Sequence, residues 1–185
     1  MKKTVITFGL ISGTISALMG LTAMPLLDKI GANQTEILGY TTIILSFLMV
    51  FVGIRSYREN AGHGEISFGR AFAVGILITL ISCGCYVATW EVLYFNFSSV
   101  HSAMDKYAAN LEDKAKASGA SDAEIQAQLQ QIVRFKELYQ NPYYNSAITF
   151  LEPFPIGLVI TLGSAGVLRR RRKTTRVAAA LTSST

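Results

Sequence analysis

The sequence has few charged residues, four prolines and only two cysteines. Charged residues make up 16% of the chain and hydrophobic residues 50%, whereas roughly a quarter of a soluble domain is charged. Cys83 and Cys85 lie in one apolar run, as S-C-G-C-Y. This spacing fits neither a disulfide framework, nor a C-x-x-C redox pair, nor a zinc site. The composition therefore argues against an ordinary soluble domain, and we interpret both cysteines as small packing residues.

Patterns typical of catalytic and metal sites are missing as well. Serine and histidine occur without a nucleophile elbow, a triad context or a phosphate-binding loop. His63 and Glu65, in the sequence G-H-G-E, are too few ligands for a metal site. We therefore expect no enzymatic activity, no catalytic residue, no cofactor and no metal. The net charge of +5 could suggest nucleic acid, but the basic residues flank apolar segments and favour a membrane surface instead.

The chain is organised around an uncharged apolar stretch from Ala71 to Trp90. Its 20 residues would rise about 30 Å as an α-helix, which is the thickness of the hydrocarbon core of a bilayer. Arg70 ends the stretch on one side, and Glu91 with several aromatic residues ends it on the other. A positive end and an aromatic end are typical of a membrane-spanning helix.

Three further apolar stretches predict an all-α integral membrane protein with four transmembrane helices. The predicted spans cover about residues 5–27, 37–55, 69–95 and 145–168. A signal peptide is the rival interpretation of the first span, but its apolar run exceeds the roughly 7–15 residues of a signal sequence. Gly9, Gly13 and Ala17 recur at every fourth position of that span and predict close helix packing in lipid. We expect residues 1–173 to form a single membrane domain and residues 174–185 to form a disordered cytoplasmic tail.

The charged segment between the third and fourth spans predicts an amphipathic helical hairpin over about residues 98–141. Val100, Leu111 and Ala115 belong to a pattern with helical spacing. Ser121 and Glu124 form a capping box that begins a second helix. We expect this hairpin to lie outside the bilayer or on its surface.

Basic residues give the predicted orientation. Of the 17 lysines and arginines, 11 flank one predicted side, whereas ten of the 12 acidic residues lie on or near the other. An excess of lysine and arginine in short flanks marks the cytoplasmic side. We therefore expect a bacterial inner-membrane protein with both termini in the cytoplasm and the hairpin extracytoplasmic. The longest basic run is interpreted as an anchor, or alternatively as a site for anionic lipid headgroups; it comprises Arg169, Arg170, Arg171, Arg172 and Lys173.

Two carboxylates, Glu91 and Glu152, are the candidate intramembrane site. Counted along their helices, both would reach the outer leaflet at similar depth. One interpretation is that they are interfacial carboxylates that reach water. The other is a pocket that holds a proton, a cation or a basic partner. The Glu-Pro-Phe-Pro sequence from Glu152 favours the pocket, because irregular backbone at membrane depth is normally sheltered by protein or lines a cavity.

Three motifs resemble the domain-of-unknown-function 4199 family of small bacterial membrane proteins: GIRSYREN-AGHGEISFGRAFAVG, the Tyr86–Trp90 pair, and EPFPIGL with its basic exit. The resemblance extends from about Lys3 to Lys173. It implies four transmembrane helices with a helical insertion between the third and fourth, and it implies no activity. It also suggests a cytoplasmic surface for a lipid headgroup or a partner, formed by Arg55, Arg58, Asn60, Ser67, Gly69 and Arg70. The alternative for that surface is a topological anchor with a tight turn.

Three functions remain in competition. The first is a non-enzymatic membrane protein that associates with lipids, with itself or with another membrane protein. The second is an oligomeric transporter or proton/cation channel that uses Glu91 and Glu152. The third is a lipid-modifying enzyme, which would need a clustered acid/base pair.

Overall fold

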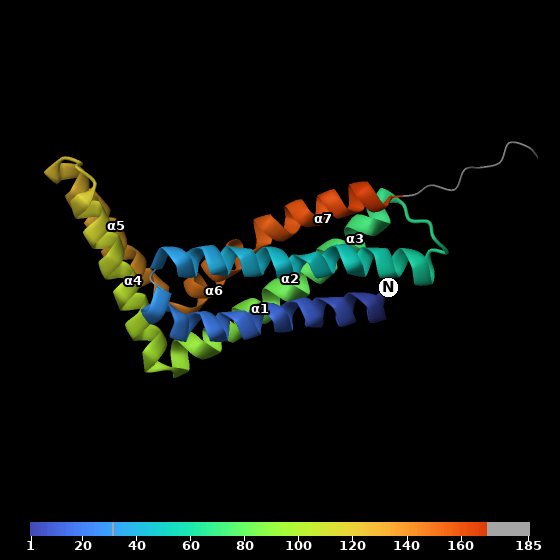
Figure 1. Cartoon of the computed structure of the whole chain (residues 1–185), viewed down its shortest axis with the longest axis horizontal. Coiled ribbons are helices and arrows are strands. Elements are labelled where there is room, and N and C mark those ends of the chain that lie inside the picture. The colour runs from blue at the N-terminus through green and yellow to red at the C-terminus, as the bar shows by residue number, and fades with distance from the viewer. Residues whose placement is uncertain (31, 170–185) are drawn as a thin grey trace, which may run out of the picture.

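The computed structural model describes the backbone of residues 1–30 and 32–169, and the side chains of that range apart from residues 19, 20, 22–30, 32, 33, 35, 36, 99, 101, 103, 104 and 107. All regular elements within it are helices, which confirms the predicted all-α class (Figure 1). They are α1 (Lys2–Ile30), α2 (Ala32–Ala61), α3 (Phe68–Asn96), α4 (Ser98–Ala117), α5 (Asp122–Tyr139), α6 (Pro142–Leu151) and α7 (Phe154–Leu168).

Helices α1, α2, α3 and α7 lie lengthwise in one bundle (Figure 1). Helix α1 packs against α2 and α3, and α7 packs against α2 and α3. Val50 and Ile54 of α2 and Val74 and Ile78 of α3 are completely buried at the centre of the core. The outward faces carry exposed large apolar side chains instead, Leu48 of α2 among them. Buried small and branched residues inside and large apolar residues outside suit a bundle surrounded by lipid.

Three segments of the described chain are long and apolar enough to cross a membrane. They are Ile37–Ala61, Phe68–Asn96 and Pro142–Leu168. The last of these includes both α6 and α7. These segments are compatible with a membrane protein, as the composition suggested.

Glycines of α1 allow close contact with α3, as their spacing predicted. A Cβ added at Gly9 would lie 2.8 Å from the Cβ of Ile81, and one at Gly13 would lie 2.6 Å from the Cβ of Cys85. Both distances are shorter than real side chains tolerate. These two positions of α1 therefore require glycine for the observed helix separation.

Serine hydroxyl groups join α1, α2 and α3 inside the apolar core. The Oγ of Ser12 lies 2.9 Å from the Oγ of Ser46 and 2.9 Å from that of Ser82. Ser16 donates to the Oγ of Ser46 at 2.7 Å, and Ser46 donates to the backbone oxygen of Ser12 at 2.7 Å. All four serines are buried. Where water is absent, such bonds satisfy the hydroxyl groups and hold the helices in register.

The last apolar segment is two helices rather than one. Helix α6 ends at Leu151 with Glu152 as its C-cap, and α7 begins one residue after Pro153. Pro153 and Pro155 lack the N–H groups that would continue the hydrogen bonds of α6. The break therefore lies ten residues into the helical segment, not at its start.

Helices α4 and α5 pack against each other and stand across the end of the bundle opposite the N-terminus (Figure 1). The turn between them contains Gly119, whose φ of 71° favours glycine. Ser121 and Glu124 form the predicted capping box at the start of α5. An ion pair of 2.8 Å between Lys136 and Asp105 joins the two helices. These two helices are called the α4–α5 pair below.

Candidate functional site

The candidate carboxylates Glu91 and Glu152 lie on the same interface, between α3 and α6. The Ser146 hydroxyl donates to the Oε1 of Glu91 at 2.8 Å, and the Tyr86 hydroxyl donates to the Oε2 of Glu152 at 3.4 Å. Glu91 is partly buried and Glu152 is exposed. Tyr86 and Glu91 are about 7.5 Å apart along the helix axis. Each carboxylate therefore accepts a hydrogen bond from a hydroxyl group of the other helix, and the two hydrogen bonds lie at different heights along α3.

A buried polar and aromatic cluster lies next to Glu91, where α3, α5 and α6 meet. The rings of Tyr94 and Tyr139 meet edge to face, with centroids 5.3 Å apart. The Nδ2 of Asn145, which is fully buried, donates to the backbone oxygen of Tyr139 at 3.1 Å. Thr149 donates to the Oδ1 of Asn145 at 3.2 Å. These bonds fix the end of α5 to the first half of α6, at the start of the apolar segment Pro142–Leu168.

Tyr139 keeps its hydroxyl protonated in this cluster. Burial is the largest influence and raises the pKa of Tyr139, while interactions with Thr149 and Trp90 act in the opposite direction. The indole Nε1 of Trp90 is buried and completes no hydrogen bond within the described part of the chain. A buried donor without an acceptor costs about 1–3 kcal/mol. The cluster therefore has unused hydrogen-bonding capacity beside Tyr139.

The six residues of the predicted cytoplasmic surface lie at the opposite end of the bundle, where α2 ends and α3 begins. Arg58 donates to the backbone oxygen of Leu168 at 3.4 Å, and so links the end of α2 to the end of α7. Asn60 donates to Ser56 at 3.2 Å. Ser67 caps α3 by accepting from the backbone N–H of Arg70. Arg58, Asn60 and Ser67 therefore have structural roles. The other members of the predicted surface, Arg55, Gly69 and the side chain of Arg70, are exposed.

The G-H-G-E sequence forms a tight turn between α2 and α3. A Cβ at Gly62 would overlap the backbone oxygen of Glu65. His63 and Gly64 both have positive φ angles, of 50° and 85°. Ile66 follows with 3% of its surface exposed and packs into the main core. The first motif of the family resemblance, GIRSYREN-AGHGEISFGRAFAVG, therefore contains an anchored connection between two helices.

The predicted basic anchor is only partly within the described residues. Arg169 is exposed and caps α7 at its C-terminal end. Arg170, Arg171, Arg172 and Lys173 lie outside the described residues, as does the expected tail of residues 174–185. Lys2 and Lys3 are exposed at the start of α1, at the same end of the bundle as the end of α7 (Figure 1).

The described residues contain no group of three or more His, Cys, Asp or Glu side chains that could hold a metal ion. Cys83 is buried and Cys85 is partly buried, and both are free thiols. His63 and Glu65 are exposed. The chemistry that the carboxylate interface can offer is hydrogen bonding and proton exchange.

The fold is that of a helical protein with segments apolar enough to cross a membrane. Residues 7–170 match the sequence model of a family described as protein of unknown function, DUF4199, and the chain belongs to that family. No curated protein and no solved structure matches the chain.

Sequence reasoning did not identify the hydroxyl partners of the two glutamates, nor the serine cluster. Ser12 and Ser16 are one helical turn apart in an apolar span, and this spacing could have indicated a polar contact inside the bundle. Ser146 and Tyr86 carry no comparable signal, because their pairing depends on the relative height of α3 and α6.

Proposed function

We propose that this is a non-enzymatic, four-span protein of the bacterial inner membrane that acts by association with lipids or membrane partners. Both termini lie in the cytoplasm, and the α4–α5 pair is extracytoplasmic. The observation that carries the proposal is the excess of basic residues at the end of the bundle away from the α4–α5 pair. Lys2, Lys3, Arg55, Arg70 and Arg169 are exposed at one end, and the α4–α5 pair stands across the other (Figure 1).

Helix α1 is the fourth span in this proposal. Its 29 residues rise about 44 Å, more than the thickness of the hydrocarbon core. The sequence has no charge between Lys3 and Asp28. Its close packing on α3 through Gly9 and Gly13, and its serine bonds to α2 and α3, support a position inside the same bilayer as those helices.

Labelling of single cysteines tests the orientation. In a background with Cys83→Ala and Cys85→Ala, Ala123→Cys places a thiol on the exposed start of α5, and Ala61→Cys places one at the end of α2. A membrane-impermeant maleimide applied to intact bacterial cells should label the Ala123→Cys variant. The Ala61→Cys variant should be labelled only after permeabilisation, and the reverse pattern would refute the orientation.

Association is tested separately. Crosslinking in cells followed by mass spectrometry should recover a second copy or another membrane protein attached to the exposed lysines of the α4–α5 pair, such as Lys106 and Lys116. Native mass spectrometry should then show the same species together with bound lipid. A protein that is strictly monomeric and free of lipid and partners would contradict the proposal.

A proton or cation pathway is the second candidate, favoured by the break between α6 and α7. Prolines at 153 and 155 leave the backbone oxygens of residues 149 and 151 without their usual helical donors. Glu152 lies at that break and accepts from Tyr86. Because four spans rarely enclose a path, this function needs an oligomer.

Flux into liposomes distinguishes the two functions. A pathway through the carboxylates predicts proton or cation flux for the wild type and a large decrease for Glu152→Gln and Glu91→Gln. Glu137→Gln, on the exposed face of α5, is the matched control and should leave the flux unchanged. Absence of flux in the wild type, or equal flux in all variants, removes this candidate.

A further inference from the structure

The last two turns of α5 carry apolar side chains that no other part of the described chain covers. Phe135 is 37% exposed and Leu138 is 39% exposed. We propose that these two side chains enter the headgroup region of the bilayer and hold this end of the α4–α5 pair on the lipid surface, while the turn between α4 and α5 stays in water. The proposal rests on the membrane placement above, but it holds for either orientation of the protein.

Chain connectivity brings the end of α5 to the surface of the bilayer. The apolar segment Pro142–Leu168 has 27 residues, which rise about 40 Å as a helix, and a bilayer with both headgroup regions measures about 40–45 Å. A segment of this length places Pro142 in or near the headgroup region. Leu138 precedes Pro142 by four residues, which span at most about 14 Å even when fully extended. The covalent chain therefore keeps Leu138 close to lipid.

The packing of α5 keeps its end at that level. The α4–α5 pair stands across the end of the bundle instead of continuing along its axis (Figure 1). The buried Asn145 of α6 donates to the backbone oxygen of Tyr139 at 3.1 Å, which holds the last turn of α5 against the membrane segment. Tyr143, in the first turn of α6, is 88% exposed. Tyrosine is typical of membrane interfaces, where its ring contacts lipid and its hydroxyl group reaches water.

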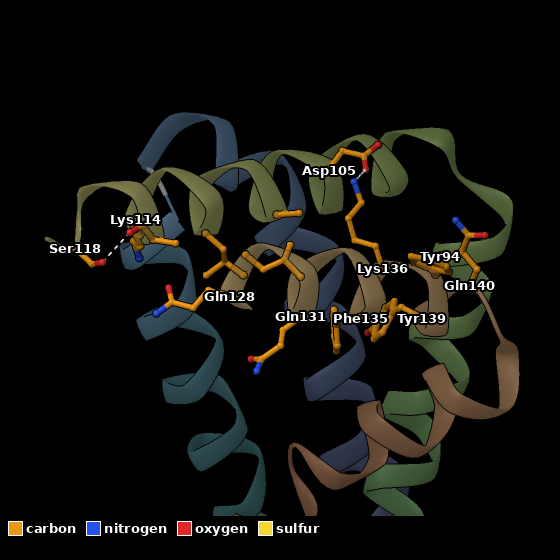
Figure 2. A pocket seen from close by; sticks show the side chains of 14 residues that line it. Tyr94, Asp105, Lys114, Ser118, Gln128, Gln131, Phe135, Lys136, Tyr139 and Gln140 are labelled. Carbon is orange, nitrogen blue, oxygen red and sulfur yellow. Dashed lines mark hydrogen bonds and ion pairs between the residues drawn. The ribbon is translucent and has the colours of Figure 1, made fainter. Parts of the chain in front are cut away.

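Phe135 and Leu138 lie on the side of α5 that faces the bundle. In Figure 2 the bundle helices extend downward from the pair, and Gln131 and Phe135 point down from α5. Leu138 follows Phe135 by three residues and Gln131 by seven, and both spacings place side chains on one helix face. Lys136 reaches in the opposite direction, up to Asp105 of α4 (Figure 2). The ion pair is therefore directed away from the face that we assign to lipid.

The same face of α5 becomes polar with distance from α6. Glu124 precedes Gln131 by seven residues, so that Glu124, Gln131 and Leu138 form one stripe along the helix. The Oε2 of Glu124 accepts from the Ser121 hydroxyl at 2.8 Å at the start of α5, and a charged carboxylate is costly to remove from water. The turn that precedes Ser121 projects away from the bundle (Figure 1). Lipid contact is therefore restricted to the end of α5 beside α6.

Spin labels on single cysteines test the lipid contact. Full-length protein with Cys83→Ala and Cys85→Ala is reconstituted in vesicles of phosphatidylethanolamine and phosphatidylglycerol, and a nitroxide is attached to Leu138→Cys. Power saturation compares how strongly the label is relaxed by oxygen, which concentrates in lipid, and by the water-soluble complex NiEDDA. Oxygen should relax the label at position 138 more strongly than NiEDDA does. If Leu138→Cys does not fold, Phe135→Cys replaces it, with the same expected result.

Two further positions give matched controls. Val133 is also apolar and is 52% exposed, but it precedes Phe135 by two residues and so lies about 160° away around the helix. The ratio of oxygen to NiEDDA relaxation should be several-fold higher for Leu138→Cys than for Val133→Cys. Leu48→Cys, on the outward face of α2, reports the hydrocarbon core and should give the highest ratio.

The outcomes separate this inference from the membrane placement. Equal ratios at positions 138 and 133, with a lipid signal at position 48, would overturn the lipid contact of α5 alone. Low relaxation of Leu138→Cys by both reagents would also overturn it, because a second copy or another protein would then cover this face. A label at position 48 that NiEDDA relaxes as strongly as oxygen does would refute the membrane placement, and the lipid contact with it.

Discussion

The hydroxyl oxygens of Thr79 and Thr161 lie 2.9 Å apart where α3 crosses α7, and both residues are fully buried. A glycine lies beside each threonine. A Cβ at Gly75 would lie 2.8 Å from the Cγ2 of Thr161, and a Cβ at Gly157 would lie 2.5 Å from the Cγ2 of Thr79. In each helix the glycine precedes the threonine by four residues. Gly75 leaves room for Thr161, and Gly157 leaves room for Thr79.

Replacement of Thr161 by valine should destabilise the bundle by about 0.6 kcal/mol and by no more than about 1.7 kcal/mol, the average and the maximum measured for hydrogen bonds between membrane helices. The change keeps the shape of the side chain and leaves the hydroxyl of Thr79 without its partner. Unfolding in detergent with a denaturant measures the effect. The combined variant Thr79→Val, Thr161→Val should cost less than the sum of the single variants, and strict additivity would show that the two hydroxyl groups do not interact.

Replacement of Gly13 by alanine should destabilise the protein by about 1–3 kcal/mol, because the added methyl group forces α1 away from Cys85. Gly163→Ala is the matched control, since a Cβ at Gly163 meets nothing within 4 Å. The control should be neutral or stabilising by about 0.5–1 kcal/mol, because alanine favours helix. Thermal unfolding in the same detergent compares them. Equal stability of the two variants would contradict the close α1–α3 contact.

Replacement of Gly62 by alanine should open the turn between α2 and α3 and cost about 1–3 kcal/mol of local strain. The new Cβ would overlap the backbone oxygen of Glu65, whereas a Cβ at Gly69 meets nothing within 4 Å. Hydrogen exchange of residues 58–66 should therefore accelerate in Gly62→Ala and remain unchanged in Gly69→Ala. Protection that is the same in both variants would show that the turn tolerates a side chain.

The capping box of α5 should make the start of that helix sensitive to acid. Hydrogen bonds from the side chain and backbone of Ser121 lower the pKa of Glu124 below the ordinary value of 4.5. A lowered pKa means that the charged carboxylate stabilises the folded state above pH 4.5, and that this contribution is lost as the pH falls through the folded pKa. NMR titration of the Glu124 carboxyl group measures the pKa. Ser121→Ala should raise it toward the ordinary value, and an unchanged pKa would refute the capping interaction.

The sequence predicted those features of the fold that depend on a single helix. The uncharged runs predicted apolar helices, the spacing of Gly9 and Gly13 predicted close packing, and Ser121 with Glu124 predicted the start of α5. Each of these signals lies within a few turns of one helix. The prolines at 153 and 155 indicated a break, but the helix that precedes it could not be distinguished from a loosely formed start.

The candidate site was less predictable because it depends on contacts between distant segments. The height of Glu91 relative to Ser146 depends on how α3 packs against α6, and no local sequence pattern indicates it. The cavity between α4 and α5 (Figure 2) also has no signature in sequence, because two of its lining residues, Leu111 and Ile132, follow ordinary amphipathic spacing. The cavity arises only from the position of α4 relative to α5.

The break at Glu152 and Pro153 also has a consequence for biogenesis. Helices α6 and α7, with 10 and 15 residues, measure about 15 and 22 Å, and neither alone reaches across a hydrocarbon core of about 30 Å. In the four-span arrangement proposed above, α6 and α7 are therefore two incomplete pieces that have to enter lipid together. In that arrangement, a ribosome that stalls between α6 and α7 would leave this crossing of the nascent chain unfinished.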